Sequence, residues 1–418
     1  MLREEVSRAH GAPRAGAANT PKRRRARARW ALSGRARVTA CVVGFLGLTT
    51  IGPAWAAPIY TVRDLGTLGG SATIASGYGT VNTVGQVVGT SLLGNGAQRA
   101  FRTPPEGTMT AASNLGTLGG SSSQGYGINV LGQVVGQSTA SGPGASPHAF
   151  RTAGNGLVTS ASDLGTLGGT SSVAYGINVL GQAVGSSLDA NAASHAFRTA
   201  PNGLITPESD LGTLGGTEST AFAVNVFGQA VGSSSIAENA ATRAFRTAPN
   251  GEITPASDLG TLGGTASVAY AINDRGQVAG TASIVGGATH AFRTTPNGVI
   301  TPESDLDTLG GRSSFAFAIN AAGQVVGRSQ TASSSAGHAF FADASGPMQD
   351  LNDLIPADSG WVLVWATGIS DAGHIAGYGT LNGQTRAFLL TVPEPGMVGM
   401  MGLGGLVALA RRRRRGTE

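Results

Sequence analysis

The histidines of this chain recur at one position of a repeated pattern, which makes them the first candidates for chemistry. Four of them come directly before an Ala-Phe dipeptide, at His148, His195, His290 and His338. A ring of imidazoles could bind a metal ion or supply a general base. In other copies the same place is held by Arg99, Arg243 and Arg386, and a permanently charged guanidinium can fill neither role. We therefore expect these side chains to cover strand edges and the following phenylalanines to pack between repeats.

Acidic residues form a second recurring set, each opening an Asp-Leu-Gly or Asp-Leu-Asp sequence: Asp64, Asp163, Asp210, Asp258 and Asp305. They could bind calcium or face a central channel, but Asp at a strand end commonly caps a turn, which is what we expect. Calcium needs several carboxylates in one loop, and local groups occur only at residues 305–307 and 350–353. The Gly-Gly doublets lack the Lys-Ser or Lys-Thr of a phosphate loop, and no Cys or His cluster has zinc spacing. The sequence thus predicts no catalytic or metal site, no cofactor and no enzyme activity.

Trp361 and Trp365 are the only tryptophans of the predicted mature chain. They lie four residues apart in a segment that alternates as a strand, so we expect them to share a face. With Asp358, Asp371 and His374 nearby, they are candidates for contact with a glycan. The alternative is that the two rings pack where the repeat array closes.

These residues belong to a unit that occurs seven times. The phenylalanine of the Ala-Phe dipeptide recurs in steps of 47 to 49 residues, at Phe101, Phe150, Phe197, Phe245, Phe292, Phe340 and Phe388. An Asn-x-x-Gly sequence, such as Asn178 with Gly181, predicts a hairpin turn, because Asn bonds nearby backbone and Gly tolerates positive φ. We expect four strands per unit, in the third unit at residues 173–178, 182–184, 195–199 and 204–211.

Four antiparallel strands per unit of 40 to 50 residues are typical of β-propeller blades. Residues 361–390 supply only three strands, whereas the predicted mature chain opens with an additional strand at residues 59–65. Pairing of that strand with residues 387–390 would complete the seventh unit. The predicted fold is therefore all-β, a seven-bladed β-propeller closed by its N-terminal strand, with a β-solenoid as the alternative.

The N-terminus has the order of a signal peptide. It is rich in Arg, then apolar at residues 38–46, and ends in an A-x-A pattern formed by Ala54 and Ala56. This pattern predicts cleavage by signal peptidase after Ala56, with Ala57 as the new N-terminus. The alternative, a retained anchor, needs about 20 apolar residues, which this run lacks. Residues 1–56 are thus predicted to be a basic leader and signal peptide.

The C-terminal residues 392–418 have three parts in a fixed order: the motif Val392, Pro393, Glu394 and Pro395, an apolar stretch at 396–410, and the cluster Arg411, Arg412, Arg413, Arg414 and Arg415. This order resembles the PEP-CTERM sorting signal of Gram-negative bacteria that produce polysaccharide. The resemblance implies recognition and processing by a membrane-embedded exosortase. The apolar stretch gives about 22 Å of helix, less than the ~30 Å hydrocarbon core, which fits a transient anchor in the inner membrane. A plain tail anchor is the alternative.

The repeat resembles the HAF family of bacterial extracellular repeats. The resemblance rests on the His-Ala-Phe triplet, as at residues 195–197, and on the Leu-Gly-Gly and Ile-Asn-x-x-Gly-Gln elements. It covers the repeat domain, residues 57–391, and implies export without implying an activity.

The net charge of +5 does not indicate nucleic-acid binding, because 16 of the 28 basic residues lie in residues 1–37 and 411–415. The stretch between carries about −8, and a nucleic-acid binder needs a basic surface on its folded part. The units differ most in Ser, Ala, Gly or Asn-rich segments such as 138–147 and 331–337, which suits surface contact. We expect a non-catalytic display or binding scaffold at the cell surface or in the exopolysaccharide matrix, with extracellular polysaccharide as a partner. The alternative is a polysaccharide-active enzyme, which requires acids that break the repeat pattern and point into the axis.

Overall fold

The computed structural model describes residues 60–142 and 145–392, which form seven antiparallel sheets, one for each predicted unit. The predicted all-β class is confirmed. Five sheets have three strands each: β2 (Gly69–Ile74), β3 (Val88–Leu93) and β4 (Gln98–Arg102); β5 (Gly119–Ile128), β6 (Val134–Ala140) and β7 (Pro147–Arg151); β8 (Gly168–Ile177), β9 (Ala183–Asp189) and β10 (Ser194–Arg198); β11 (Gly215–Val224), β12 (Ala230–Ile236) and β13 (Thr242–Arg246); β14 (Gly263–Ile272), β15 (Val278–Ile284) and β16 (Thr289–Arg293).

The last two sheets have four strands. Their members are β17 (Gly310–Ile319), β18 (Val325–Thr331), β19 (Ser334–Ala342) and β20 (Met348–Asp350), then β21 (Trp361–Ile369), β22 (Ile375–Leu381), β23 (Gln384–Thr391) and β1 (Thr61–Asp64). Ala54, Ala56, Ala57 and the sorting residues after Val392 lie outside the described residues.

The helices of the described chain are short 3₁₀ turns. Five of them occupy the same place in successive units: η1 (Ala111–Ser113), η2 (Ser160–Ser162), η3 (Pro207–Ser209), η5 (Pro255–Ser257) and η6 (Pro302–Ser304). Two others are η4 (Ala237–Asn239) and η7 (Leu351–Leu354).

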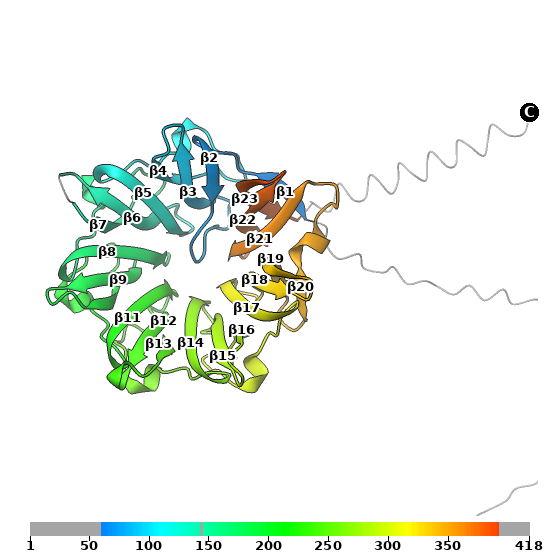
Figure 1. The fold of residues 1–418 in the computed structure, drawn as a ribbon. Helices are drawn as coiled ribbons and strands as arrows, with labels where there is room; N and C mark the ends of the chain where they lie inside the picture. The colour runs from blue at the N-terminus through cyan, green and yellow to red at the C-terminus, as the bar shows by residue number, and fades with distance from the viewer. Residues whose placement is uncertain (1–59, 143–144, 393–418) are drawn as a thin grey trace, which may run out of the picture. The chain divides into compact units, whose positions relative to one another are not determined.

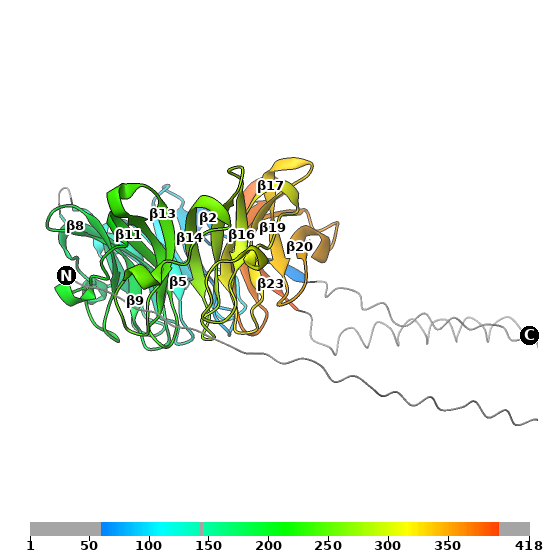
Figure 2. The same ribbon diagram turned by 90° about the horizontal axis from the view of Figure 1, so that it is seen from below.

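The seven sheets of the repeat domain lie around a common axis (Figure 1). In each unit the first long strand lies nearest the axis, and these inner strands contact one another from β5 through β8, β11, β14 and β17 to β21. Turned by 90°, the same body shows the sheets side by side along its rim (Figure 2).

The predicted pairing of the N-terminal strand with the last strand of the array is confirmed. β1 runs antiparallel to β23, with Thr61 opposite Thr391 and Asp64 opposite Phe388. Tyr60 and Leu65, on either side of β1, are 5% and 0% exposed, so the beginning of the described chain is buried against its end.

The prediction of a fourth strand in every unit is wrong for the five three-stranded sheets. In the third unit the segment predicted at 204–211 contains η3, and only Asp210 bridges to Phe197 of β10. The cause is local: the Ser209 amide donates to the Thr206 carbonyl, and the Thr206 amide donates to the Ser209 hydroxyl. Backbone groups that satisfy one another within a 3₁₀ turn are not available for a strand ladder.

The variable segments are also shorter than predicted. Strand β6 continues through Ala140, and β18 and β19 leave only residues 332–333 between them. Residues 138–140, 147, 331 and 334–337 of these segments therefore belong to strands.

The repeated phenylalanines pack between neighbouring sheets, as predicted. All seven are fully buried. Phe197, for example, lies in a cluster with Val135 and Ala149 of the preceding sheet and with Ala174 and Ala183 of its own. The Asn-x-x-Gly turns are confirmed as well: the Gly181 amide donates to the Asn178 carbonyl at 3.1 Å, and Gly181 has a φ of 75°.

Polar side chains join each of the first five sheets to the next at two recurring positions. Ser172 of β8 accepts the Ala149 amide of the preceding sheet and donates to the Gly165 carbonyl, at 2.8 and 2.6 Å. The arginine after Ala-Phe reaches forward: Arg151 donates to the carbonyls of Gly181 and Gly203 in the following unit. Burial lowers the pKa of Arg151 and of its four counterparts, Arg102, Arg198, Arg246 and Arg293. These repeated polar residues are therefore structural.

Candidate functional site

The recurrent histidines and aspartates lie together at the outer side of the sheets. His148 Nδ1 is 3.0 Å from Asp163, and His195 and His290 pair with Asp210 and Asp305 at 2.8 and 2.9 Å. His338 pairs with Asp350 in the sixth unit, and Arg386 lies 3.9 Å from Asp64 where the array closes. We expected the histidines to lie on strand edges but did not identify their aspartate partners. In the first three pairs the aspartate follows the histidine by 15 residues, and this recurring spacing is the signal that could have revealed them.

The aspartates also cap turns, as predicted. Asp163 and Asp210 accept the amides of Gly165 and Gly212, both at 2.8 Å. Asp163 bridges to β7, which lies on the far side of β6 from the inner strand β5. This set of aspartates therefore does not line the axis. Within residues 60–142 and 145–392, no group of three or more His, Cys, Asp or Glu side chains is arranged to hold a metal ion.

The prediction that Trp361 and Trp365 share a face is wrong. A β-bulge lies between Leu363, which is opposite Gly379, and Trp365, which is opposite Tyr378. The additional residue turns Trp365 to the other side of the sheet. Trp361 packs edge-on against Phe388 in the cluster that also contains Tyr60 and Leu390, here called the closing core, whereas Trp365 stacks with both Phe317 and Tyr378.

The group predicted around the two tryptophans does not assemble either. His374 bonds Glu106 of the first unit at 3.0 Å. Asp371 lies at the end of the axis where the Asn-x-x-Gly turns gather, and its carboxylate accepts the Ala321 amide. Trp365 lines a different cavity, described below.

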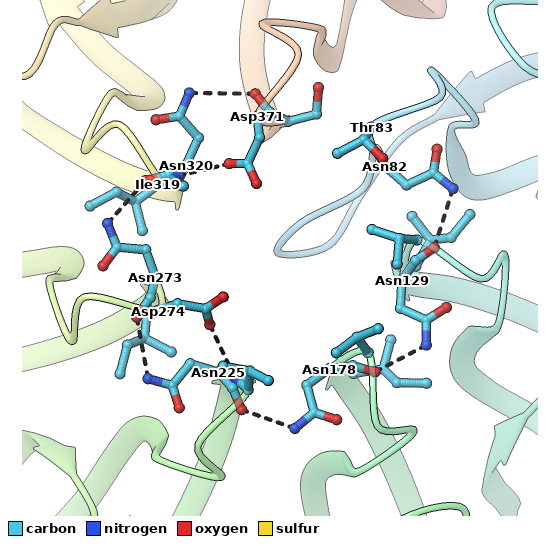
Figure 3. A pocket seen from close by; sticks show the side chains of 18 of the residues that line it. Asn82, Thr83, Asn129, Asn178, Asn225, Asn273, Asp274, Ile319, Asn320 and Asp371 are labelled. Atoms are coloured by element: carbon cyan, nitrogen blue, oxygen red, sulfur yellow. Dashed lines mark hydrogen bonds between the residues drawn. The ribbon is translucent and has the colours of Figure 1, made fainter.

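One end of the axis is a polar mouth, a cavity of about 270 Å³ edged by six asparagines from the hairpin turns: Asn82, Asn129, Asn178, Asn225, Asn273 and Asn320 (Figure 3). Each side-chain amide of this asparagine ring donates to the backbone carbonyl of the next unit, at 2.9 to 3.4 Å. Each side-chain amide also donates to the side-chain oxygen of a glutamine four residues later. The asparagine side-chain oxygen accepts the backbone amide of that glutamine, as at Asn129 and Gln133. The ring is thus occupied in joining the units.

Two acids break the repeat pattern at this mouth. The residue after the ring asparagine is Thr83, Val130, Val179, Val226 or Ala321 in five units. It is Asp274 in the fifth unit, and in the seventh unit, where Ser370 takes the place of the asparagine, it is Asp371. Both face the same cavity in Figure 3. Asp274 accepts the Val226 amide at 3.0 Å and Asp371 accepts the Ala321 amide at 2.7 Å, so each carboxylate bonds the preceding unit in the same way.

Further along the inner strands, the axis narrows to an apolar belt. It includes Ile128, Ile177, Val224 and Ile272, around a cavity of about 130 Å³. The side chains two positions earlier are aromatic and form a chain of rings: Tyr126, Tyr175, Phe222, Tyr270 and Phe317, with centroids 5.2 to 5.6 Å apart.

The aromatic residues occupy β-bulges of the inner strands. In the second unit, Gly125 is opposite Gly136 and Gly127 is opposite Val135, which leaves Tyr126 as the additional residue; the next four units repeat this shift. A bulge redirects its side chain, here toward the axis. We had expected an ordinary alternating strand, so this set of rings was missed, although the tyrosine or phenylalanine recurs at the repeat period.

The first and seventh units depart from this arrangement. In the first, residues 75–79 form a loop in place of the single bulge residue, and Tyr78 stacks on Tyr270 at 4.8 Å with an angle of 7°. Gly77 is required, because a Cβ there would lie 2.0 Å from the Tyr126 carbonyl oxygen. In the seventh, the bulge residue is Thr367, which donates to the Ala75 carbonyl instead of supplying a ring.

A cavity of about 190 Å³ lies at this break in the repeat. We call it the aromatic pocket; its lining includes Ser76, Tyr78, Tyr126, Tyr175, Phe317, Trp365, Thr367 and Tyr378. Arg328 lies over the Trp365 ring, with its Cζ 4.6 Å from the centroid. The aromatic pocket therefore combines regular bulge rings with residues of the first and seventh units, which depart from the repeat.

Burial raises the pKa of every tyrosine in the chain, most strongly at Tyr78, where the neighbouring Tyr270 adds to the effect, and at Tyr126. Above the ordinary value of 10.0, the unfolded chain loses phenolic protons that the folded chain keeps. The folded state then binds more protons than the unfolded state, so the free energy of unfolding falls as the pH rises.

We therefore expect tyrosinate absorbance to appear only as the protein unfolds in alkali. Absorbance and far-UV circular dichroism, followed together against pH, should change at the same pH. The same titration in denaturant is the control and should show ionisation near 10.0. Tyrosinate formation in a still folded chain would contradict this packing.

Comparison with known families supports the sorting signal predicted at the C-terminus. Residues 391–415 match the PEP-CTERM protein-sorting motif, so the predicted sorting signal is confirmed. The motif implies an exported protein that passes through a membrane-anchored stage and is processed by exosortase on its way to the cell surface. Residues 204–387 match a family described as protein of unknown function (DUF3466). No curated protein matches the chain significantly.

These matches do not test the resemblance to HAF repeats. The DUF3466 match extends over the fourth to seventh sheets. In the part of the chain that the structure describes, no helix is both long enough and apolar enough to span a bilayer.

Proposed function

We propose that the repeat domain is a seven-bladed β-propeller and serves as a non-catalytic binding scaffold, displayed at the surface or in the exopolysaccharide matrix of a Gram-negative bacterium. Seven similar sheets around one axis and the pairing of β1 with β23 support the propeller. The sorting motif supports display at the surface.

The main support for a non-catalytic role is that the asparagine side chains at the polar mouth already bond to other parts of the protein. Each ring asparagine bonds both its own turn and the next unit, so its functional groups are already occupied. Glycoside hydrolysis by two carboxylates needs an acid and a base in environments that differ. Asp274 and Asp371 each accept one amide from the preceding turn, so this hydrogen bond does not distinguish an acid from a base.

A polysaccharide-active enzyme is the second candidate, because the axis does contain two acids that depart from the repeat. The two functions differ in what happens to a bound polymer. A scaffold retains it unchanged, whereas an enzyme shortens it and releases new reducing ends.

The test incubates the purified full-length protein with extracellular polysaccharide from the producing cells. We expect the protein to co-sediment with the polymer, and the size distribution and the number of reducing ends to stay constant. The double variant Asp274→Asn with Asp371→Asn should bind equally well. New reducing ends that disappear in the double variant would establish the enzyme, and absence of binding would reject the scaffold.

A further inference from the structure

The aromatic pocket lies where the repeat pattern is interrupted. Such an interruption can give an array of similar units a single, distinct binding site. Units two to six each supply one ring at the bulge, and these rings contact one another along the inner strands. In the seventh unit Thr367 takes that place, and the ring is instead Trp365, two residues earlier. The missing ring leaves a cavity, and a cavity at only one position of the array can bind one ligand in one orientation.

The chemistry of the lining narrows the class of ligand. Trp365 and Tyr378 are stacked at 5.7 Å with an angle of 10°, and Phe317 continues the stack on Trp365. Ser76, Tyr78 and Tyr175 add hydroxyl groups, which both donate and accept hydrogen bonds, whereas the Tyr126 hydroxyl is already bonded to Gln124 and Gln137. An aromatic wall beside hydroxyl groups suits a ligand ring that has an apolar face and polar substituents around its edge.

Charge excludes the other common ligand of aromatic cages, a quaternary ammonium ion. The guanidinium of Arg328 lies 4.6 Å from the Trp365 ring and would repel a second cation there. Among the described residues that line the pocket, none carries a carboxylate to offset this repulsion.

We propose that the aromatic pocket binds one pyranose ring of a polysaccharide, with Trp365 as part of the pocket wall that contacts it. This inference rests on the proposed binding function and names its ligand and its site. The polar mouth at the other end of the axis takes no part in it, because its asparagines are occupied in joining the units.

The experiment uses the mature protein with two matched tryptophan variants. Immobilised oligosaccharides of neutral hexoses and of uronic acids serve as probes, and tetramethylammonium serves as the cationic probe. Trp365→Ala should weaken oligosaccharide binding by about tenfold or more, a loss typical of truncating a central aromatic side chain. Trp361→Phe should bind as the unchanged protein does, because Trp361 packs in the closing core on the other face of the strand.

Two further measurements keep the test independent of folding. Ser76→Tyr removes no existing ring and should block binding by filling the pocket, with an unchanged melting temperature. In Trp361→Phe, Trp365 is the remaining tryptophan of the predicted mature chain, and its fluorescence should change when the oligosaccharide is added.

The outcomes separate the pocket from the proposed function. If Trp365→Ala and Ser76→Tyr still bind polysaccharide fully, the scaffold function stands and the assignment of the pocket is wrong. If the unchanged protein binds no saccharide, the binding function itself fails. Saturable binding of tetramethylammonium that competes with no saccharide would overturn the proposed ligand class.

Discussion

Deletion of residues 60–65 is expected to cost the repeat domain most of its net stability. The deletion removes β1 together with Tyr60 and Leu65, which are 5% and 0% exposed. Burial of each large apolar side chain contributes about 1.5–3 kcal/mol. The ladder to β23 is lost as well, so the total approaches the 5–15 kcal/mol that a folded domain typically has in all.

The same deletion should also promote aggregation. Leu389 and Leu390 of β23 are fully buried beneath or beside β1, and they would lie on an unprotected edge strand without it. Thermal unfolding and light scattering at several protein concentrations measure the two effects. We expect a strongly lowered melting temperature and scattering that rises with concentration.

The control changes the chain by the same number of residues at a tolerant position. Six Gly and Ser residues inserted after Gly286 lengthen the hairpin between β15 and β16, beside Val285, which is 80% exposed. Lengthening a surface loop costs little entropy, so this variant should melt close to the unchanged protein. If the deletion and the insertion melted alike, β1 would have no closing role.

Most of the fold prediction rested on the repeat period. The phenylalanine spacing identified the seven units, and each Phe is buried between sheets because a large apolar side chain at a fixed interval must be covered by the neighbouring copy. The Asn-x-x-Gly turns could be predicted from local chemistry alone. The pairing of β1 with β23 followed from counting strands at the two ends.

The errors of prediction arose where local hydrogen bonds overrode strand alternation. The sequence of residues 204–211 is compatible with a strand, but the reciprocal bonds of Thr206 and Ser209 hold a 3₁₀ turn there. Trp361 and Trp365 are spaced to share a face, and a single bulge separates them. A pattern of side chains cannot reveal such a bulge, because the additional residue changes the register without changing the residue types.

The candidate site was predicted only in part. Trp365 was named as a candidate for glycan contact, but its supposed neighbours Asp371 and His374 lie elsewhere. The residues that surround it, Tyr78 and Tyr378 among them, come from the first and last units. These units stand at opposite ends of the sequence, and the structure brings them together. A comparison of the copies at the bulge position, which finds Thr367 in place of a ring, is the sequence signal that could have located the pocket.

Deletion of residues 392–418 is expected to move nearly all of the protein from the cell surface into the medium or periplasm. The deleted segment contains the matched sorting motif, and without it exosortase has no recognition sequence. The deletion also removes the apolar stretch and Arg411 to Arg415, so no transient anchor holds the protein at the membrane. Immunoblots of cell fractions and medium measure the redistribution.

Folding and sorting can be separated in this experiment. β23 ends at Thr391, so the deletion removes no strand, and the truncated protein should melt as the full chain does. A narrower variant, with serine at positions 411–415, keeps the Pro-Glu-Pro motif and the apolar stretch but removes the charge that favours the cytoplasmic side. It should be mislocalised as well, because orientation in the membrane precedes processing. Unchanged surface location of both variants would show that the repeat domain itself, and not the tail, directs this protein to the surface.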